Sequence, residues 1–322
     1  MLEDVIFVLK DFLLWARRRL FLLAYSATAL SIMVPFLFVK AIFDRAHGNN
    51  WFADPLGKPG LFQYGVELMA FALGTVFLRT KKATEDAYAA TKSASIRGSG
   101  DGVTVVLMED YLEFQSPQQR DPAETDAKGD RSLVGVIIIP GALISPFAYS
   151  ILARDLARKG YPSFVLRLPF DLAFYGWSTA GRIIKRPHKQ GQVPAPTKWV
   201  LLGHSLGASG VQRFTDARPE CVDGMVFLGG GHLIAGNLAK LDIPSLLIWG
   251  SRDPFTPTKM LQKAKKKMPM GADSVVIPGG NHRGFASYSR QALDWEATIT
   301  PEEQRQKTVE ALVEFIEQKV VP

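Results

Sequence analysis

Three residues whose side chains could together perform acyl transfer lie far apart in the chain: Ser205, Asp253 and His282. A serine hydroxyl is a weak nucleophile until a base takes its proton, and a histidine base needs a carboxylate to hold its tautomer. Each of the three follows an apolar run typical of a buried strand, and these runs cover residues 198–202, 244–249 and 273–277. The order serine, acid, histidine along the chain therefore predicts a catalytic triad at one edge of a sheet.

The strongest local signal is the string Gly-His-Ser-Leu-Gly at 203–207, which follows one apolar run directly and opens a helical pattern. A nucleophile between a strand and a helix lies in a sharp turn, so the residues two before and two after it must be small. Gly203 and Gly207 meet this requirement around Ser205. An incidental glycine-rich turn is the alternative interpretation of the string.

The acid and the base have structural alternatives as well. Asp253 precedes Pro254 and could instead be a turn-forming aspartate, and His282 could be a surface histidine in a loop. His204 is adjacent to the serine in sequence, but its side chain must point away from that of the nucleophile. We therefore expect His204 to be a packing residue.

The negatively charged oxygen of an acyl-transfer intermediate needs two backbone N–H donors. We expect one donor from Leu206, at the N-terminus of the helix that follows the serine. The other should come from the loop after the apolar run 133–139, where Gly141 permits a close approach of the chain. Ala142 is the expected donor in that loop, and Leu143 is the alternative.

The last two thirds of the chain alternate apolar runs with helical patterns, which is typical of a parallel sheet covered by helices on both faces. We therefore expect an α/β fold with a doubly wound, mostly parallel sheet.

The aromatic-rich stretch 169–197 either lines one wall of the site or forms a packed excursion. Strands are expected at 103–108, 111–114, 133–139, 163–168, 198–202, 224–228, 244–249 and 273–277, and helices at 147–159, 206–217, 257–268 and 302–319.

Residues 133–322 resemble the alpha/beta hydrolase superfamily, and specifically its small fold-5 group, which is related to dienelactone hydrolases. The matching segments are PGALISPFAYSILARDLARKGY (140–161), GHSLG (203–207), GSRDPFTP (250–257), GGNHRGFASY (279–288) and WEATITPEEQRQKTV (295–309). The resemblance implies the alpha/beta hydrolase fold, with Ser205 as nucleophile, Asp253 as acid and His282 as base. It does not extend to the N-terminal third.

The N-terminal third is strongly apolar. Residues 20–39 contain no charged side chain, and a helix of this length covers about 30 Å, the thickness of the hydrocarbon core of a bilayer. A second apolar stretch, 61–78, carries one charge, Glu67. We expect it to span as well, with an interfacial or re-entrant helix as the alternative. Residues 2–16 place their apolar side chains on one helical face, which predicts an interfacial helix.

These stretches divide the chain into a membrane anchor at 1–82, a linker at 83–100 and a hydrolase domain at 101–322. Basic residues crowd the two outer ends of the predicted helical hairpin, namely Arg17, Arg18, Arg19, Arg79, Lys81 and Lys82. Lys and Arg favour the cytoplasmic side of short flanks. We therefore expect the N-terminus and the hydrolase domain on the same, cytoplasm-like face of the bilayer. A single span would place the domain on the opposite face.

Composition argues against several other classes of protein. The single cysteine, Cys221, rules out a disulfide framework and a cysteine-based metal site. The five histidines show no metal-ligand spacing, so we expect neither a metal nor an organic cofactor. The net charge of +7 is not concentrated on a module with nucleic-acid motifs, so we expect no nucleic-acid partner.

The sequence is best interpreted as a membrane-anchored serine hydrolase that cleaves an ester, thioester or related acyl bond through a covalent acyl-enzyme. A non-catalytic hydrolase-fold subunit or scaffold of a membrane complex is the main alternative, because a fold does not dictate a function. A lipid-binding accessory protein is a further alternative. So is other chemistry on the same triad, such as that of a lyase or a cofactor-free haloperoxidase.

Overall fold

The computed structural model describes residues 80–92, 101–115, 134–186, 196–230, 237–289, 291 and 293–321. All of them belong to the second of two compact units, Thr80–Pro322. The predicted interfacial helix at 2–16 and the predicted spans at 20–39 and 61–78 lie outside the described residues. Within the described stretches, no helix has both the length and the apolarity to cross a bilayer.

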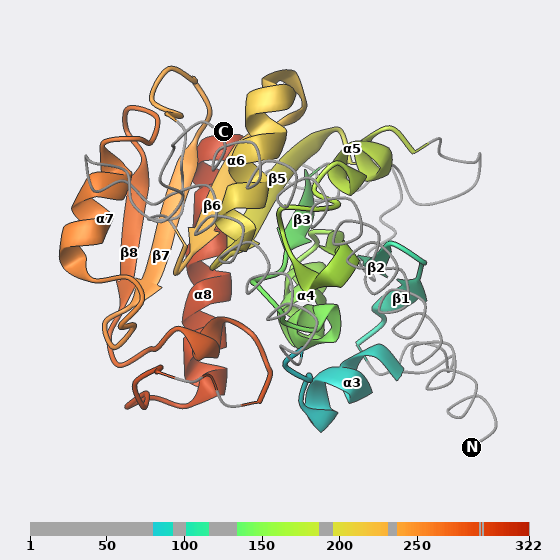
Figure 1. Ribbon diagram of the computed structural model, residues 1–322. Helices are drawn as coiled ribbons and strands as arrows, with labels where there is room; N and C mark the ends of the chain where they lie inside the picture. Colours follow the sequence, from blue (N-terminus) through green and yellow to red (C-terminus); the bar gives the residue numbers. More distant parts are fainter. Residues whose placement is uncertain are drawn as a thin grey trace, which may run out of the picture. The chain divides into compact units, whose positions relative to one another are not determined.

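The described unit is built on an eight-stranded sheet with the order β1-β2-β4-β3-β5-β6-β7-β8 (Figure 1). The strands are β1 (Thr104–Leu107), β2 (Tyr111–Gln115), β3 (Val134–Ile139), β4 (Ser163–Leu166), β5 (Lys198–His204), β6 (Gly224–Leu228), β7 (Ser245–Gly250) and β8 (Asp273–Ile277). The six neighbouring strands β4, β3, β5, β6, β7 and β8 pair in parallel. By contrast, β1 pairs antiparallel with β2, and β2 pairs antiparallel with β4. The prediction of a mostly parallel α/β sheet is confirmed.

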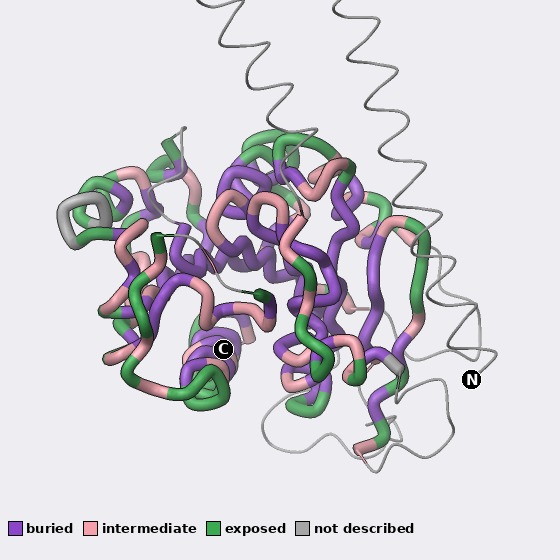
Figure 2. The backbone as a smooth tube through the Cα atoms, turned by 60° about the horizontal axis from the view of Figure 1, so that its bottom comes forward, coloured by how far each residue is buried: buried purple, intermediate pink, exposed green. Residues whose placement is uncertain are grey.

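Helices cover both faces of this sheet. They are α3 (Glu85–Lys92), α4 (Ser150–Arg158), α5 (Thr179–Ile184), α6 (Gly207–Ala217), α7 (Thr258–Lys265) and α8 (Pro301–Phe315). Gly224 on β6 borders Phe315 of α8, whereas the next residue, Met225, belongs to a buried cluster with Phe214 of α6 and Ala264 of α7. Successive strand residues point to opposite faces, so α8 lies on one face and α6 and α7 on the other. Figure 2 shows the buried residues concentrated in the strands between these two layers.

The predicted linker at 83–100 is wrong for its first part, because residues 85–92 form α3. The Tyr88 ring packs 5.1 Å from that of Phe147, and Arg154 of α4 donates to the carbonyl oxygen of Ala90 (2.8 Å). The small, polar composition of this segment concealed a helix that is held by tertiary contacts rather than by a long apolar stripe. The compact unit begins at Thr80 and not at residue 101. Residues 93–100 lie outside the described stretches.

Candidate active site

Ser205 lies in a sharp turn between β5 and α6. Its φ angle is +51°, a left-handed conformation that costs a non-glycine residue about 1–2 kcal/mol. Its N–H donates to the carbonyl oxygen of Leu228 at the end of β6 (2.9 Å), and the residue is partly exposed. The backbone therefore presents this serine at the carboxyl edge of the parallel strands, in a strained strand–turn–helix connection.

Close backbone contacts explain the glycines on either side of this turn. A Cβ atom on Gly203 would lie 2.6 Å from the carbonyl oxygen of Gly207. A Cβ atom on Gly207 would collide with the carbonyl oxygen of Ile139, at the end of β3. Only glycine fits at either position. The second contact also sets the turn directly against the strand from which the predicted oxyanion loop emerges.

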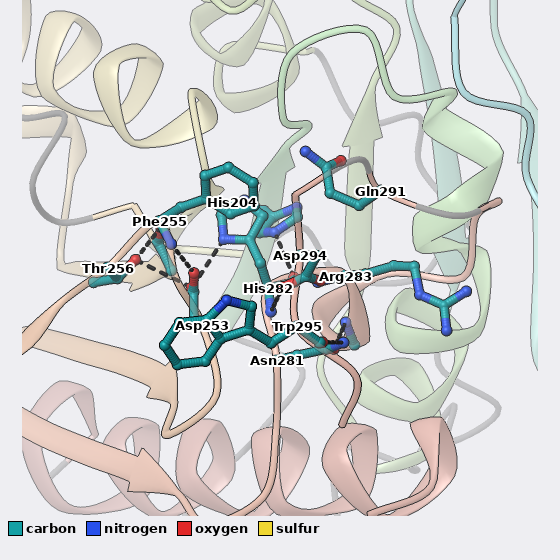
Figure 3. Close-up of polar contacts among 12 residues, drawn as sticks. His204, Asp253, Phe255, Thr256, Asn281, His282, Arg283, Gln291, Asp294 and Trp295 are labelled. Atoms are coloured by element: carbon teal, nitrogen blue, oxygen red, sulfur yellow. Dashed lines mark hydrogen bonds and ion pairs between the residues drawn. The ribbon is translucent and has the colours of Figure 1, made fainter. Parts of the chain in front are cut away.

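His282 and Asp253 form a buried pair on neighbouring loops (Figure 3). The Nδ1 atom of His282, after β8, lies 2.8 Å from Oδ2 of Asp253, after β7. The carboxylate also accepts the N–H of Phe255 (2.8 Å), and the Thr256 hydroxyl lies 2.9 Å from the carbonyl oxygen of Gly229 and 3.1 Å from Oδ2 of Asp253. Because a carboxylate can only accept hydrogen bonds, the proton of the imidazole belongs on Nδ1. Nε2 of the neutral ring is then free to act as a base.

The loop that carries His282 is fixed through its main chain. The N–H groups of His282 and Arg283 donate to the two carboxylate oxygens of Asp294 (3.2 and 2.8 Å). Burial raises the pKa of Asp294, and these two N–H groups act in the opposite direction. The buried side chain of Gln304 on α8 bonds both the N–H (3.0 Å) and the carbonyl oxygen (2.7 Å) of Asn281. Helix α8 and Asp294 thus hold the base in place.

His204 is a buried hydrogen-bonding residue and not only a packing one. The N–H of Gly141 donates to the Tyr149 hydroxyl (2.9 Å), which lies 2.7 Å from Nδ1 of His204. Nε2 of His204 lies 3.2 Å from the carbonyl oxygen of His282. Since a carbonyl oxygen only accepts, Nε2 carries the proton and Nδ1 accepts from the tyrosine. This chain of hydrogen bonds ties the start of the loop after β3 to the residue that serves as the candidate base.

The ionisation of this buried chain follows from its environment. Burial lowers the pKa of His204 well below its ordinary value, and the neighbouring His282 adds to the shift. Burial likewise raises the pKa of Tyr149 well above its ordinary value. Both groups therefore stay neutral, in the protonation states that the hydrogen bonds require.

Gly229 and Gly230, after β6, fit closely between the three candidate catalytic residues. A Cβ atom on Gly229, whose φ angle is +55°, would lie 2.9 Å from Oδ2 of Asp253 and 3.0 Å from Nδ1 of His282. A Cβ atom on Gly230 would collide with the backbone of Ser205. These adjacent glycines let the serine turn and the His–Asp pair approach the same short segment. The run of glycines at 229–231 is the signal in the sequence for this approach, and it was not among the predicted site residues.

Two of the predicted oxyanion donors have N–H groups without a partner within the described residues. Within the described residues, the N–H groups of Ala142 and Leu206 make no hydrogen bond. The N–H of Leu143 donates instead to the carbonyl oxygen of Asp171 (2.7 Å), so this alternative donor is occupied. The preceding N–H, that of Gly141, is occupied by the tyrosine hydroxyl. Of the donors considered from the sequence, Ala142 and Leu206 are the two that could bind an oxyanion.

The aromatic stretch after β4 combines both of the roles considered for it. Its first turn borders the loop after β3 through the Leu143–Asp171 hydrogen bond. Phe174 and Tyr175 then expose 38% and 50% of their surface. Trp177 packs instead against Phe214 of α6, with the ring centroids 6.4 Å apart. The stretch therefore borders the site at its beginning and packs onto the helix layer further along.

The structure thus gathers the three candidate catalytic residues at the carboxyl edge of β5, β7 and β8. Asp253 and His282 are hydrogen-bonded to each other. Within the described residues, the hydroxyl of Ser205 makes no hydrogen bond to His282; such contacts often tighten only when substrate binds. No group of three or more His, Cys, Asp or Glu residues in the described part of the chain could hold a metal ion. His47, His188 and His232 lie outside that part.

A protein family and several solved structures are similar to this chain. Residues 135–306, which are 172 of the 322 residues, match the model of the alpha/beta hydrolase family. Similar solved structures include dienelactone hydrolase from Anabaena variabilis ATCC 29413, with 16% identity and a TM-score of 0.48 over 68% of this chain and 99% of that one. Est1E from Butyrivibrio proteoclasticus has 13% identity and a TM-score of 0.46 over 67% of this chain and 100% of that one. No curated protein matches the chain.

Proposed function

Since the chain belongs to the alpha/beta hydrolase family, we propose that it is a serine hydrolase that cleaves an ester, thioester or related acyl bond. The observation that supports this most strongly is the buried His282–Asp253 pair beside a serine held at positive φ. A pair of this kind activates a hydroxyl by taking its proton. The N–H groups of Leu206 and Ala142, which have no partner within the described residues, would add the second requirement, a site for the developing oxyanion.

In the first half of the proposed reaction, Oγ of Ser205 attacks the acyl carbon while Nε2 of His282 takes the hydroxyl proton. The acyl oxygen becomes negatively charged and accepts the N–H groups of Ala142 and Leu206. Asp253 keeps the ring in orientation and stabilises the imidazolium through Nδ1. The intermediate collapses when the leaving group departs with the proton from Nε2, which leaves an acyl group on Ser205.

In the second half, water replaces the alcohol or thiol. Nε2 of His282 takes a proton from water, and the oxygen of that water attacks the acyl carbon on Ser205. The same two N–H groups hold the second oxyanion. Collapse releases the carboxylic acid and returns the proton to Oγ of Ser205. Every step uses side chains, backbone groups and water alone, so we propose no metal or organic cofactor.

We also propose that the enzyme is anchored to a lipid bilayer by the apolar stretches 20–39 and 61–78. The basic residues at the outer ends of these stretches support a helical hairpin, with the N-terminus and the hydrolase domain on one cytoplasm-like face. Protease treatment of sealed vesicles tests this with epitopes at both chain ends. Both epitopes should be cleaved together or protected together. Opposite fates would exclude the hairpin.

The catalytic proposal is tested by turnover of short-chain and lipid esters with the full-length protein in detergent. Ser205→Ala should keep the thermal unfolding transition and lose turnover by about a million-fold, as expected when a triad acts as a unit. Ser178→Ala, an exposed serine at the start of α5, is the matched control and should retain wild-type turnover. A folded Ser205→Ala protein with unchanged turnover would reject the proposal. A wild-type protein inactive on every ester would favour the scaffold alternative.

A further inference from the structure

Residues 80–84, which we term the strap, lie between the two loops that carry the candidate oxyanion donor and the candidate base. Lys81 forms a parallel bridge with Ile144, in the loop after β3. Ala83 forms an antiparallel bridge with Tyr288, in the loop that follows His282. The strap lies outside the region 135–306 that matches the hydrolase family.

On the oxyanion side, the strap binds the loop after β3 through three hydrogen bonds. The N–H of Lys81 donates to the carbonyl oxygen of Leu143 (2.7 Å), and the N–H of Ser145 donates to the carbonyl oxygen of Lys81 (3.0 Å). Nζ of Lys81 approaches the carbonyl oxygen of Ala142 (3.4 Å). The Lys81 side chain is partly buried, and this burial lowers its pKa. Lys81 thus hydrogen-bonds both the carbonyl oxygen of Ala142 and the carbonyl oxygen of Leu143.

The main chain of the strap also pairs with the loop that follows His282. The N–H of Thr84 donates to the carbonyl oxygen of Ser287 (3.0 Å), and the N–H of Ser289 donates to the carbonyl oxygen of Lys82 (3.1 Å). Ser287 in turn donates its N–H to the carbonyl oxygen of Ala148, in the turn before α4 (2.8 Å). The strap therefore joins the segment just after the base to the segment just after the oxyanion loop.

The loop after β3 needs such support because it is strained. Leu143 has a φ angle of +55°, a conformation that persists in a non-glycine residue only when the surroundings over-determine it. Its N–H is held by the carbonyl oxygen of Asp171, and the Asp171 carboxylate accepts the hydroxyl of Thr80 (2.7 Å). The strap thus contacts the strained residue directly through Lys81 and indirectly through Thr80.

We propose that the strap is a positioning element of the active site, in which Lys81 fixes the peptides that aim the Ala142 N–H at the oxyanion. The inference rests on the proposed hydrolase function. An oxyanion donor acts only when it is pre-positioned at the place where charge develops, and tenths of an ångström matter for such a donor. Lys81 is a positioning residue and not a catalytic one, because it acts through Ala142. A hydrolase domain that began at residue 101 would lack this element.

The test compares two adjacent lysines in the full-length protein. Proline at position 81 removes the N–H that donates to Leu143. Proline at position 82 is the matched control, because within the described residues the N–H of Lys82 makes no hydrogen bond and its side chain is exposed. Lys81→Pro and Lys82→Pro each remove one positive charge and introduce one residue with a fixed φ angle. Lys81→Met and Lys82→Met form a second pair that removes only the ammonium groups, and Lys81→Arg is the conservative variant.

The readouts are kcat and KM for a neutral 4-nitrophenyl ester, and the inhibition constant of an alkyl boronic acid, whose tetrahedral adduct with Ser205 mimics the oxyanion. Lys81→Pro should lower kcat by at least about tenfold and weaken the boronic acid by a similar factor, with KM changed by less than about twofold, since only the transition state needs the donor. Lys81→Met should show a smaller loss of the same kind, restored by Lys81→Arg. Lys82→Met should resemble wild type, and Lys82→Pro should retain clearly more kcat and boronic acid affinity than Lys81→Pro, because it leaves the Lys81 N–H in place.

Equal effects of the position 81 and 82 variants on kcat and on boronic acid binding would overturn the inference. Thermal unfolding of each variant shows whether it is folded. Should Lys81→Pro fail to fold, the two methionine variants decide by the same criterion. An inactive wild-type protein that also fails to bind the boronic acid would instead reject the proposed function. The two failures are therefore distinguishable.

Discussion

Nδ1 of His282 lies 2.8 Å from Oδ2 of Asp253, and the Asp253 side chain is fully shielded from solvent. A buried carboxylate in this position fixes both the orientation and the tautomer of the imidazole. The carboxylate also accepts the N–H of Phe255, and the Thr256 hydroxyl lies between Oδ2 of Asp253 and the carbonyl oxygen of Gly229. These contacts hold the pair in place, and within the described residues Nε2 of His282 makes no hydrogen bond.

Asp253→Asn should lower kcat by about a thousand- to ten-thousand-fold, because the amide can donate to Nδ1 and so favours the tautomer with its proton on Nε2. The loss should be smaller than for His282→Ala, which removes the base itself. Steady-state kinetics on one ester substrate compare the two variants, and Asp242→Asn at an exposed position serves as control. If Asp253→Asn were as active as the control, the acid of the triad would have to be another carboxylate.

Gly229→Ala should damage catalysis more than Gly271→Ala, although both glycines have positive φ angles, +55° and +84°. The new methyl group at position 229 would press on Asp253 and His282 at 2.9 and 3.0 Å, whereas nothing lies within 4 Å of the one at position 271. Both variants should lose about 1 kcal/mol of stability from the backbone conformation. Only Gly229→Ala should also lose kcat, by about a hundredfold. Equal kcat values for the two variants would contradict the close packing behind the pair.

Tyr149→Phe should destabilise the protein by about 1–3 kcal/mol, because it leaves the buried N–H of Gly141 and Nδ1 of His204 without their partner. Denaturant unfolding measures this loss, and Tyr175→Phe, at a half-exposed tyrosine, should change the stability little. We also expect Tyr149→Phe to lower kcat, since the hydroxyl helps to hold the oxyanion loop. A stability loss no greater than that of the control would show that the hydroxyl does not bridge these groups.

Stability should fall on acidification because of His204, whose pKa is lowered well below its ordinary value by burial and by His282. An unfolded histidine titrates near pH 6.5, so below this pH the unfolded state binds a proton that the folded state excludes. The charged or titratable groups around His204 are Tyr149, His282 and Lys81. The free energy of unfolding should therefore decrease from pH 7 toward pH 5, with a slope of up to about 1.4 kcal/mol per pH unit from this one residue.

His204→Gln tests that assignment, because a glutamine cannot take up the proton. Denaturant unfolding of wild type and variant between pH 5 and pH 8 should show a pH dependence that is weaker in the variant by up to one proton. Identical slopes would place the titrating group elsewhere. Activity at each pH is recorded separately and is not used to assign the group that changes the stability.

Much of this architecture could be predicted from the sequence because it depends on local patterns. Every predicted strand is present, and near-continuous apolar runs identified the central strands β3 to β7, which are buried on both faces. The turn at Ser205 could be predicted because a Cβ atom at position 203 or 207 would collide with backbone atoms, so that both positions require glycine. Asp253 and His282 could be placed at the same edge because the carboxyl ends of parallel strands meet there.

The contacts that join distant segments could not be predicted in this way. His204 was expected to be only a packing residue, because its partner Tyr149 lies 55 positions away. The role of Asp294 depends on how the irregular segment after His282 folds back on itself over twelve residues, and no periodic pattern in the sequence predicts that path. Lys81 and Lys82 look alike in the sequence, and only tertiary pairing distinguishes the bonded N–H from the unbonded one. Main-chain pairing of this kind has no side-chain signature.

The central claim is that Ser205 forms a covalent acyl intermediate, and peptide mapping after treatment with a fluorophosphonate tests it most directly. The probe reacts with a serine only when a base activates it and an oxyanion site stabilises the adduct. Mass spectrometry of the digested full-length protein should find one adduct, on Ser205, and none in His282→Ala or in protein unfolded before treatment. An unmodified Ser205 in folded wild-type protein, or an adduct on a different serine, would contradict the account.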